Sequence, residues 1–188
     1  MPPKTSVTRE KIVEAAVDFV RKNGADQLNA RALAKALSCS TQPLFYQFES
    51  MQEIRQAVIV RAKEIYVCFL QREMQRTDEP AYKLSGLGYI RFAKEEKELF
   101  KLLFMRERET GAPPEEDEFA DGLVEKIAQA NGFSIETARR FHGCMWVFVH
   151  GFATMMATGY LYLDDKLISD EISRVYKGVM SVYRENGL

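Results

Sequence analysis

Apolar residues recur at the spacing of an α-helix along almost the whole chain, and this periodicity limits the fold more than any other feature. In the first such stretch, Ile12, Ala16 and Phe19 would share one face of a helix that ends near Asn23 and Gly24. No stretch alternates between apolar and polar residues as a half-buried strand would. The sequence therefore predicts an all-α fold of about nine helices.

Residues that favour helix N-termini precede several of these stretches and divide the chain into elements. Asn29 would cap the second helix, and Ser40 would cap a short third helix. Ser50 and Glu53 have the spacing of a capping box in front of a fourth helix that reaches about Arg76. Further helices are expected at roughly 80–94, 96–109, 119–130, 134–158 and 165–185, with a proline-containing loop at 110–118.

Composition and cysteine usage favour a reducing compartment. Apolar residues make up 46% of the 188-residue chain, which is enough to fill a packed core. The three cysteines, Cys39, Cys68 and Cys144, form no CxxC pair, so a disulfide framework is not expected. The first ten residues lack the apolar segment of a secretory signal. These features together predict a cytoplasmic protein.

Charge is distributed unevenly along the chain. Residues 1–48 carry seven basic and four acidic side chains, a net charge of +3, whereas the remainder carries −4. A basic N-terminal part attached to an acidic body fits an anionic partner such as a nucleic acid. Ordinary scatter of charges would explain the same difference, so charge alone leaves both interpretations open.

Residues 141–163 hold no Asp, Glu, Lys or Arg, and their length of 23 residues makes them a candidate membrane span. Two histidines, three glycines and two threonines within the segment argue against burial in lipid. The other expected helices are amphipathic. A helix that is apolar on all sides is also found in a protein core or a subunit interface, and we expect that placement here.

The first three expected helices, with the short connection LSCS at residues 37–40, have the order of a helix-turn-helix motif. On a helical wheel Leu44 and Phe48 face the core, while Gln42, Pro43 and Tyr46 face outward. A proline early in a helix lacks only an N–H that the first turn leaves unpaired anyway. In such a motif the last helix enters the major groove of DNA, where polar side chains bind base edges.

Residues 8–54 resemble the N-terminal domain of the TetR family of transcriptional repressors. The shared features include the Ala15-Ala16 pair, Gly24 at the end of the first helix and the Leu44-Phe45…Phe48 ending. The resemblance implies a homodimer with a helix-turn-helix domain at residues 1–50 and a larger helical ligand-binding and dimerisation domain at 51–188. It implies double-stranded DNA with a palindromic operator as one partner and a small-molecule effector as another.

The resemblance also implies which residues contact DNA. Thr41, Gln42 and Pro43 would form the base-reading group, and Tyr46 would touch sugars or thymine methyl groups. The full expected set is Arg31, Ser40, Thr41, Gln42, Pro43, Phe45 and Tyr46.

Three positions depart from the family pattern. Phe45 stands where the family usually has a tyrosine that contacts phosphate, so Tyr46 would have to supply that hydroxyl. Met51 replaces a common phosphate-binding lysine. Ser38 replaces a common glycine, so the turn must tolerate a Cβ atom there.

By the same resemblance, the helices near 134–158 and 165–185 would pair with their copies in a homodimer. Small residues on the first of them, Gly143, Gly151, Ala153 and Ala157, would allow close approach. Residues 146–151, WVFVHG, are similar to a Trp…His-Gly pattern in the C-terminal part of one subgroup of the family.

Aromatic side chains on neighbouring expected helices would line an apolar cavity for the effector, which we expect to be apolar or aromatic. His150 follows Trp146 by four residues and would share its helix face. Ordinary core packing would explain the same residues. The expected effector-binding set is Tyr66, Phe69, Tyr89, Phe92, Phe104, Trp146 and His150.

No pattern of an enzyme is found in the sequence. His142 and Cys144 lie two residues apart and would not face each other on a helix, and no HExxH motif accompanies them. A glycine-rich phosphate loop and a G-x-S-x-G motif are also absent. We therefore predict no catalytic site, no metal and no cofactor. The alternative to a DNA-binding regulator is a helical protein-binding scaffold without affinity for DNA.

Overall fold

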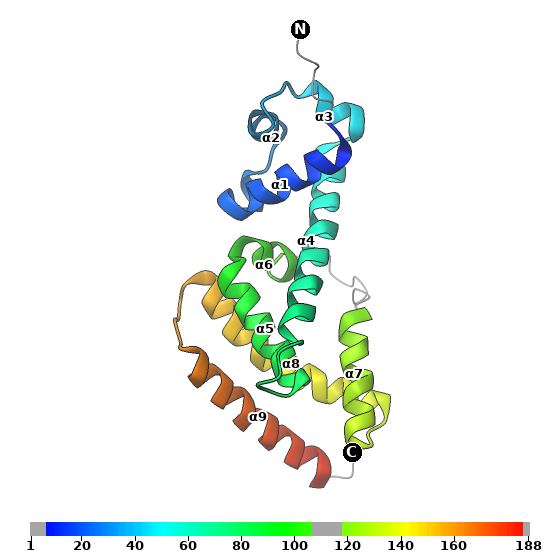
Figure 1. Ribbon diagram of the computed structural model, residues 1–188, viewed down its shortest axis with the longest axis vertical. Coiled ribbons are helices and arrows are strands. Elements are labelled where there is room, and N and C mark those ends of the chain that lie inside the picture. Colours follow the sequence, from blue (N-terminus) through cyan, green and yellow to red (C-terminus); the bar gives the residue numbers. More distant parts are fainter. Residues whose placement is uncertain (1–6, 107–117, 186–188) are drawn as a thin grey trace. The chain divides into compact units, whose positions relative to one another are not determined.

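The computed structural model describes residues 7–106 and 118–185 (Figure 1). Within these ranges the chain forms nine α-helices and one short 3-10 helix, and no strand, which confirms the all-α prediction. The elements are α1 (Arg9–Asn23), η1 (Ala25–Gln27), α2 (Ala30–Ala36), α3 (Gln42–Gln47), α4 (Met51–Glu73), α5 (Ala81–Glu95), α6 (Lys97–Phe104), α7 (Glu118–Asn131), α8 (Ile135–Thr158) and α9 (Asp165–Glu185).

Most of the predicted boundaries hold to within a few residues. Both α8 and α9 cover the expected ranges, and Ser134 caps α8 by accepting a hydrogen bond from the Thr137 N–H at 3.1 Å. The fourth helix ends at Glu73, three residues before the expected Arg76, and α6 ends at Phe104. The predicted loop at 110–118 falls almost entirely outside the described residues.

The chain divides into two compact units. The first contains residues 1–66 and 96–106, and the second contains residues 67–95 and 107–188. The division falls inside α4, and α6 belongs to the first unit. These units do not coincide with the expected functional domains at 1–50 and 51–188, which remain a prediction.

In the first unit, an apolar core holds α1, α2, α3 and the start of α4 together. Its fully buried side chains include Ile12, Leu33, Leu44 and Ile54, one from each helix. Burial of each is worth about 1.5–3 kcal/mol, so these contacts dominate the packing. Gly24 ends α1 with φ of 84°, a conformation that glycine adopts without steric cost.

Ion pairs tie the ends of these helices together. Arg9 donates to the Gln47 carbonyl oxygen and to the Glu53 carboxylate, both at 2.8 Å, and its guanidinium lies 4.0 Å from the centre of the Phe48 ring. Arg21 binds the Glu96 carboxylate through two nitrogens, at 2.9 and 3.1 Å. Arg9 therefore fixes the end of α3 against α1 and α4.

The connection between α2 and α3 contains a left-handed residue. Ser38 has φ of 53° and is the only non-glycine residue with positive φ in the described part of the chain. This is the position where the sequence departs from a common glycine. A side chain in this conformation costs roughly 1–2 kcal/mol.

Replacing Ser38 with glycine is therefore expected to stabilise the chain. Relief of the strain exceeds the added chain entropy of glycine, and we expect a net gain of about 0.5–1 kcal/mol. Urea unfolding followed by circular dichroism measures it. Ser40→Gly, two residues away and without positive φ, serves as the control. Equal effects of the two substitutions would contradict the explanation.

In the second unit α8 packs against α5, α7 and α9 (Figure 1). Phe141, Met145, Val149 and Met156 of α8 are buried, as is Phe92 of α5. The buried side of α8 lies against the unit's own helices, as expected for residues 141–163. No helix among the described residues is long and apolar enough to span a membrane.

The four small residues of α8 do not act together, contrary to the expectation that all of them line a subunit interface. A Cβ atom at Gly143 or Gly151 would meet no heavy atom within 4 Å, so both positions are open. Ala153 and Ala157 are buried inside the unit. Packing within the unit, rather than subunit contact, therefore occupies these two alanines.

Candidate functional site

The turn that precedes α3 is built from local hydrogen bonds. The Asn29 side chain caps α2 by accepting from the Ala32 N–H at 3.0 Å, as predicted. At the other end the Cys39 N–H donates to the Ala34 carbonyl oxygen at 3.0 Å. These bonds and the left-handed Ser38 reverse the chain within a few residues, so that α3 follows α2 at once.

The expected Ser40 cap of α3 is wrong. The helix begins at Gln42, its N-cap residue is Thr41, and Thr41 makes no side-chain capping hydrogen bond. An N-cap side chain usually needs extended backbone, whereas Thr41 already has helical dihedral angles of −72° and −19°. Pro43 lies within the first two positions of the helix, where its missing N–H costs nothing.

The two faces of α3 differ as predicted. Leu44 is fully buried, and Phe48, just after the helix, is 2% exposed. On the other side Tyr46 is 72% exposed and Phe45 is 45% exposed, and Gln42 is also exposed. Two large aromatic side chains adjacent on the surface of a six-residue helix are costly to leave in water unless they have a partner.

The remaining predicted DNA-binding residues surround this tip. Arg31 in α2 and Ser40 in the turn are exposed, and Thr41 and Pro43 are partly exposed. None of the seven is buried in the core, so each is accessible to a macromolecule. Their contacts with DNA remain a prediction.

One interaction at the tip could not be read from the sequence pattern. The Gln42 side-chain nitrogen donates to the Tyr46 hydroxyl at 2.6 Å, across one turn of α3. The bond fixes which way the Gln42 amide points, because its nitrogen must face Tyr46. The sequence offers one hint of this hydrogen bond: Gln42 and Tyr46 are four residues apart, a spacing at which side chains meet on a helix.

The predicted effector-binding residues include three sets of contacts. In the first unit the Tyr66 and Phe104 rings meet edge to face at 5.0 Å. In the second unit Phe69 and Phe92 do the same at 5.4 Å. Tyr66, Tyr89 and Phe92 are buried in the core. Their role in binding an effector stays a prediction.

The third set contains Trp146 and His150, which share a face of α8 as predicted. Their rings stack at 4.8 Å with an angle of 18°, and Trp146 is 44% exposed. The Tyr89 hydroxyl lies 2.9 Å from His150 Nδ1. A neutral ring that accepts this hydrogen bond carries its proton on Nε2.

A second tyrosine–histidine pair, not predicted, joins the same two helices. The Tyr82 hydroxyl lies 3.0 Å from His142 Nδ1. Burial, and next the neighbouring Tyr176, raises the pKa of Tyr82, so its hydroxyl stays protonated. The sequence does contain a sign of this second pair. The two tyrosines are seven residues apart and the two histidines eight apart, so each type recurs after about two helical turns.

Acid is expected to destabilise the chain through His150. Burial lowers its pKa below the ordinary 6.5, so the unfolded chain binds the proton more readily than the folded chain. The stability that neutral His150 contributes is complete above about pH 6.5 and is lost as the pH falls through the lowered pKa.

Urea unfolding from pH 8 to pH 5, followed through Trp146, the only tryptophan, measures this loss. His150→Gln is expected to make stability less dependent on pH below about 6.5. An unchanged pH dependence in that variant would contradict the role of His150.

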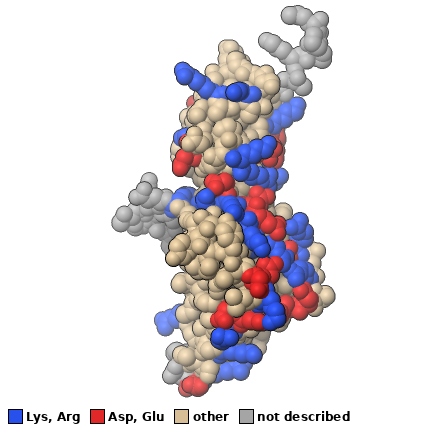
Figure 2. All heavy atoms as spheres, turned by 90° about the vertical axis from the view of Figure 1, so that its left-hand side faces the viewer, with Lys and Arg blue, Asp and Glu red and all other residues tan. Residues whose placement is uncertain are grey.

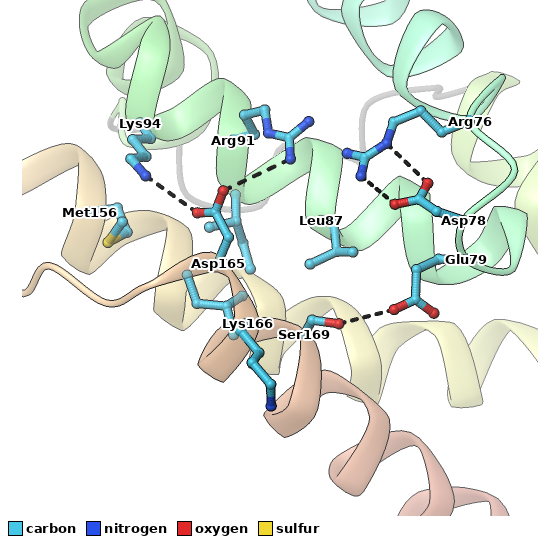
Figure 3. Close-up of a pocket in the computed structure, with 12 residues that line it drawn as sticks. Arg76, Asp78, Glu79, Leu87, Arg91, Lys94, Met156, Asp165, Lys166 and Ser169 are labelled. Atoms are coloured by element: carbon cyan, nitrogen blue, oxygen red, sulfur yellow. Dashed lines mark hydrogen bonds and ion pairs between the residues drawn. The ribbon is translucent and has the colours of Figure 1, made fainter.

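A separate hollow lies in the second unit, between the loop after α4, α5, the end of α8 and the start of α9 (Figure 3). Its volume is about 230 Å³, and none of the predicted effector-binding residues lines it. It is lined by Arg76, Asp78, Glu79, Leu87, Ile90, Arg91, Lys94, Met156, Asp165, Lys166, Ile168 and Ser169. Figure 2 shows acidic and basic side chains interspersed over the lower part of the molecule.

The curated relatives of this chain are transcriptional regulators. It is 26% identical over 179 residues to an uncharacterised HTH-type transcriptional regulator of Mycobacterium tuberculosis, covering 92% of this chain and 82% of the relative. An uncharacterised HTH-type regulator of Bacillus subtilis is 23% identical over 159 residues, or 84% of this chain and 83% of that protein. Residues 84–175 match the family described as the tetracyclin repressor-like C-terminal domain. This match covers 92 of the 188 residues, and in this part the chain is similar to the TetR family.

Solved structures agree with the TetR fold. A variant of TetR from Acinetobacter baumannii AYE in complex with minocycline gives a TM-score of 0.61 at 17% identity, covering 94% of this chain and 96% of that one. A possible TetR family regulator from Streptomyces coelicolor gives 0.50 at 20% identity, covering 79% and 69%. The likeness to these solved structures concerns the fold, and the curated relatives are described as HTH-type transcriptional regulators.

Proposed function

We propose that this chain is a TetR-type transcription regulator, a repressor that binds a palindromic operator as a dimer through α3. A small apolar or aromatic effector releases it. The observation that carries the DNA-binding part is the outward face of α3, where Gln42, Phe45 and Tyr46 stand exposed beside a buried Leu44. A rigid helix with exposed polar and aromatic side chains suits the major groove.

Selection of bound sequences from a random DNA pool tests this proposal. Two symmetric half-sites, with centres about 34–36 Å apart, are expected for a dimer. Recovery of single half-sites would contradict binding to the operator as a dimer. Failure to enrich any sequence would favour a protein-binding scaffold without affinity for DNA.

The proposed base contact is made by Gln42. Its nitrogen donates one hydrogen to the Tyr46 hydroxyl, which leaves its second hydrogen and its carbonyl oxygen to face the DNA. Adenine offers the matching pair in the major groove, an acceptor at N7 and a donor at N6. We therefore expect an A·T pair at one position of each half-site.

Phosphate contacts are fewer than in the family pattern. Phe45 has no hydroxyl and Met51 has no charge, so the positively charged Arg31 carries more of the electrostatic attraction. Arg31→Ala is expected to weaken binding to all sequences and to reduce the slope of log K against log salt by about 0.9 per protomer.

Fluorescence anisotropy with operator and unrelated DNA at several salt concentrations measures that slope. Lys35→Ala, which removes another exposed cation of α2, provides the comparison. A change of operator preference without a change of slope in Arg31→Ala would show that Arg31 reads bases instead.

The proposed dimer contact uses the open face of α8 and the exposed side of α9. Gly143, Trp146 and Val147 lie close together on that face of α8, and Val147 is 65% exposed. Val182 of α9 is 53% exposed. A C2 dimer buries the same patch on both subunits.

For the effector we propose the aromatic residues predicted above, including Phe69, Phe92 and the Trp146–His150 pair. Edge-to-face rings and a half-buried imidazole suit a flat apolar molecule with one polar group. A thermal-shift screen of planar aromatic compounds tests this class. A gel shift then asks whether the compounds that bind also release DNA.

A further inference from the structure

The hollow of about 230 Å³ in the second unit has an apolar floor and a charged rim. Ile90, Met156 and Ile168 on the floor are each no more than 3% exposed, and Leu87 also lines the hollow (Figure 3). Pockets for drug-sized ligands have volumes of about 300–1,000 Å³. This one suits a molecule with a few carbon atoms and one charged group.

Most charges on the rim are closely paired. Arg76 binds both oxygens of Asp78, at 3.1 and 2.5 Å. Glu79 accepts from Lys83 at 2.6 Å and from the Ser169 hydroxyl at 3.2 Å.

Those hydrogen bonds lower the pKa of Asp78 and Glu79, so both carboxylates stay charged and remain bound to their present partners. Lys166 is bound to Asp170 at 2.7 Å. None of these groups is arranged to receive a ligand.

One group of charges is loosely paired. Asp165 lies 3.3 Å from the Lys94 nitrogen but 3.9 Å from the nearer nitrogen of Arg91, and its side chain is 64% exposed (Figure 3). Charge-assisted hydrogen bonds are ordinarily about 2.7–2.9 Å long. The Asp165 carboxylate thus approaches both cations without binding either of them closely.

Arg91 is nevertheless held in place. Its other terminal nitrogen donates to Glu73, a carboxylate whose side chain is only 10% exposed. Glu73 also accepts from Arg76. A fixed guanidinium that presents one loosely paired nitrogen toward a hollow is preorganised for a carboxylate.

Asp165 is not required to begin α9. The Asp164 side chain accepts from the Leu167 N–H at 2.8 Å and so makes the capping contact of this helix. Asp165 can therefore leave Arg91 and Lys94 without uncapping α9.

From these contacts we propose that the hollow binds a small organic monocarboxylate, whose carboxylate displaces Asp165 from Arg91 and Lys94 while its carbon chain lies over Leu87 and Ile90. The site is separate from the proposed aromatic effector residues. The proposal concerns binding alone, so it stands or falls independently of DNA release.

Calorimetric titration of the full chain with hexanoate, hexanamide and hexylammonium at constant ionic strength tests the proposal. Hexanoate is expected to bind, and hexanamide, which has the same shape without the charge, to bind at least about fivefold more weakly. Equal binding of the two, or tighter binding of hexylammonium, would overturn it.

Two substitutions should act in opposite directions. Asp165→Asn removes the internal competitor and should strengthen hexanoate binding by about fivefold, whereas Lys94→Gln removes a cation and should weaken it by a similar factor. The controls are Asp121→Asn, which breaks an exposed ion pair with Arg139 on another part of the unit, and Lys126→Gln.

Circular dichroism of each variant verifies the fold. Hexanoate affinity that is unchanged in both Asp165→Asn and Lys94→Gln would also overturn the proposal. If Asp165→Asn disturbs α9, the Lys94→Gln result decides alone.

Discussion

Replacing Val147 with glutamate is expected to convert the proposed dimer into a monomer of 21.6 kDa. Val147 is 65% exposed and lies beside Gly143, where no neighbouring atom comes within 4 Å of an added Cβ. In a C2 interface the substitution places two carboxylates in the same buried patch, without cations to pair them. The cost of several kcal/mol corresponds to a loss of more than about 100-fold in dimer affinity.

Affinity for the operator should fall when the dimer is lost. Two linked half-site contacts bind far more tightly than one, so a monomer is expected to lose operator affinity by at least about 100-fold. Light scattering gives the mass and anisotropy gives the DNA affinity of the same sample. Since Trp146 is the only tryptophan and lies on the same face, its emission should shift to longer wavelength in the monomer.

Val60→Glu is the matched control. Val60 in α4 is 59% exposed and belongs to the first unit, so the same change of charge there should leave the mass unchanged. A Val147→Glu variant that remains dimeric would show that subunits meet elsewhere. The α8 and α9 proposal would then be wrong.

Features set by residues close together in sequence could be predicted well. The Asn29 and Ser134 caps form as expected, and α9 covers the predicted range. The inward face of α3 was also correct, because Leu44 and Phe48 are four residues apart on one side of the helix. The Ser40 cap failed because several polar residues stand in a row before α3. The cap rule alone does not say which of them has extended backbone.

Features that join distant segments could not be predicted. The rim of the hollow brings residues 76–94 together with 165–169, and in the sequence these charges look like ordinary solvated helix faces. The Tyr89–His150 and Tyr82–His142 hydrogen bonds also cross about sixty residues of chain. Periodicity shows which face of a helix is apolar, but it does not show which helix that face meets.

The second large effect is expected at Gln42. If its amide reads adenine in each half-site, Gln42→Ala should remove most of the preference for that A·T pair. A two-point contact of this kind contributes about 1–3 kcal/mol of discrimination, and a palindrome counts it twice. The ratio of affinities for the selected operator and for one with both pairs changed to G·C should therefore fall by about 30-fold or more.

The Tyr46→Phe substitution tests the orientation of the Gln42 amide while leaving the amide itself in place. The phenylalanine keeps the aromatic ring but removes the hydroxyl that accepts from Gln42 at 2.6 Å, so the amide is free to turn. We expect a partial loss of A·T preference, with the salt dependence of binding unchanged because no charge is removed. In the double variant, Tyr46→Phe should have no further effect on base preference, since the amide that it orients is gone.

Arg31→Ala provides the contrast, because loss of a phosphate contact should weaken both operators equally and change the salt slope. A Gln42→Ala variant that retains the full preference would contradict base reading by Gln42. An additive loss in the Gln42→Ala/Tyr46→Phe double variant would instead show that Tyr46 contacts the DNA independently. In that case the hydrogen bond within α3 would serve to hold the aromatic ring, and the specificity would lie with Tyr46.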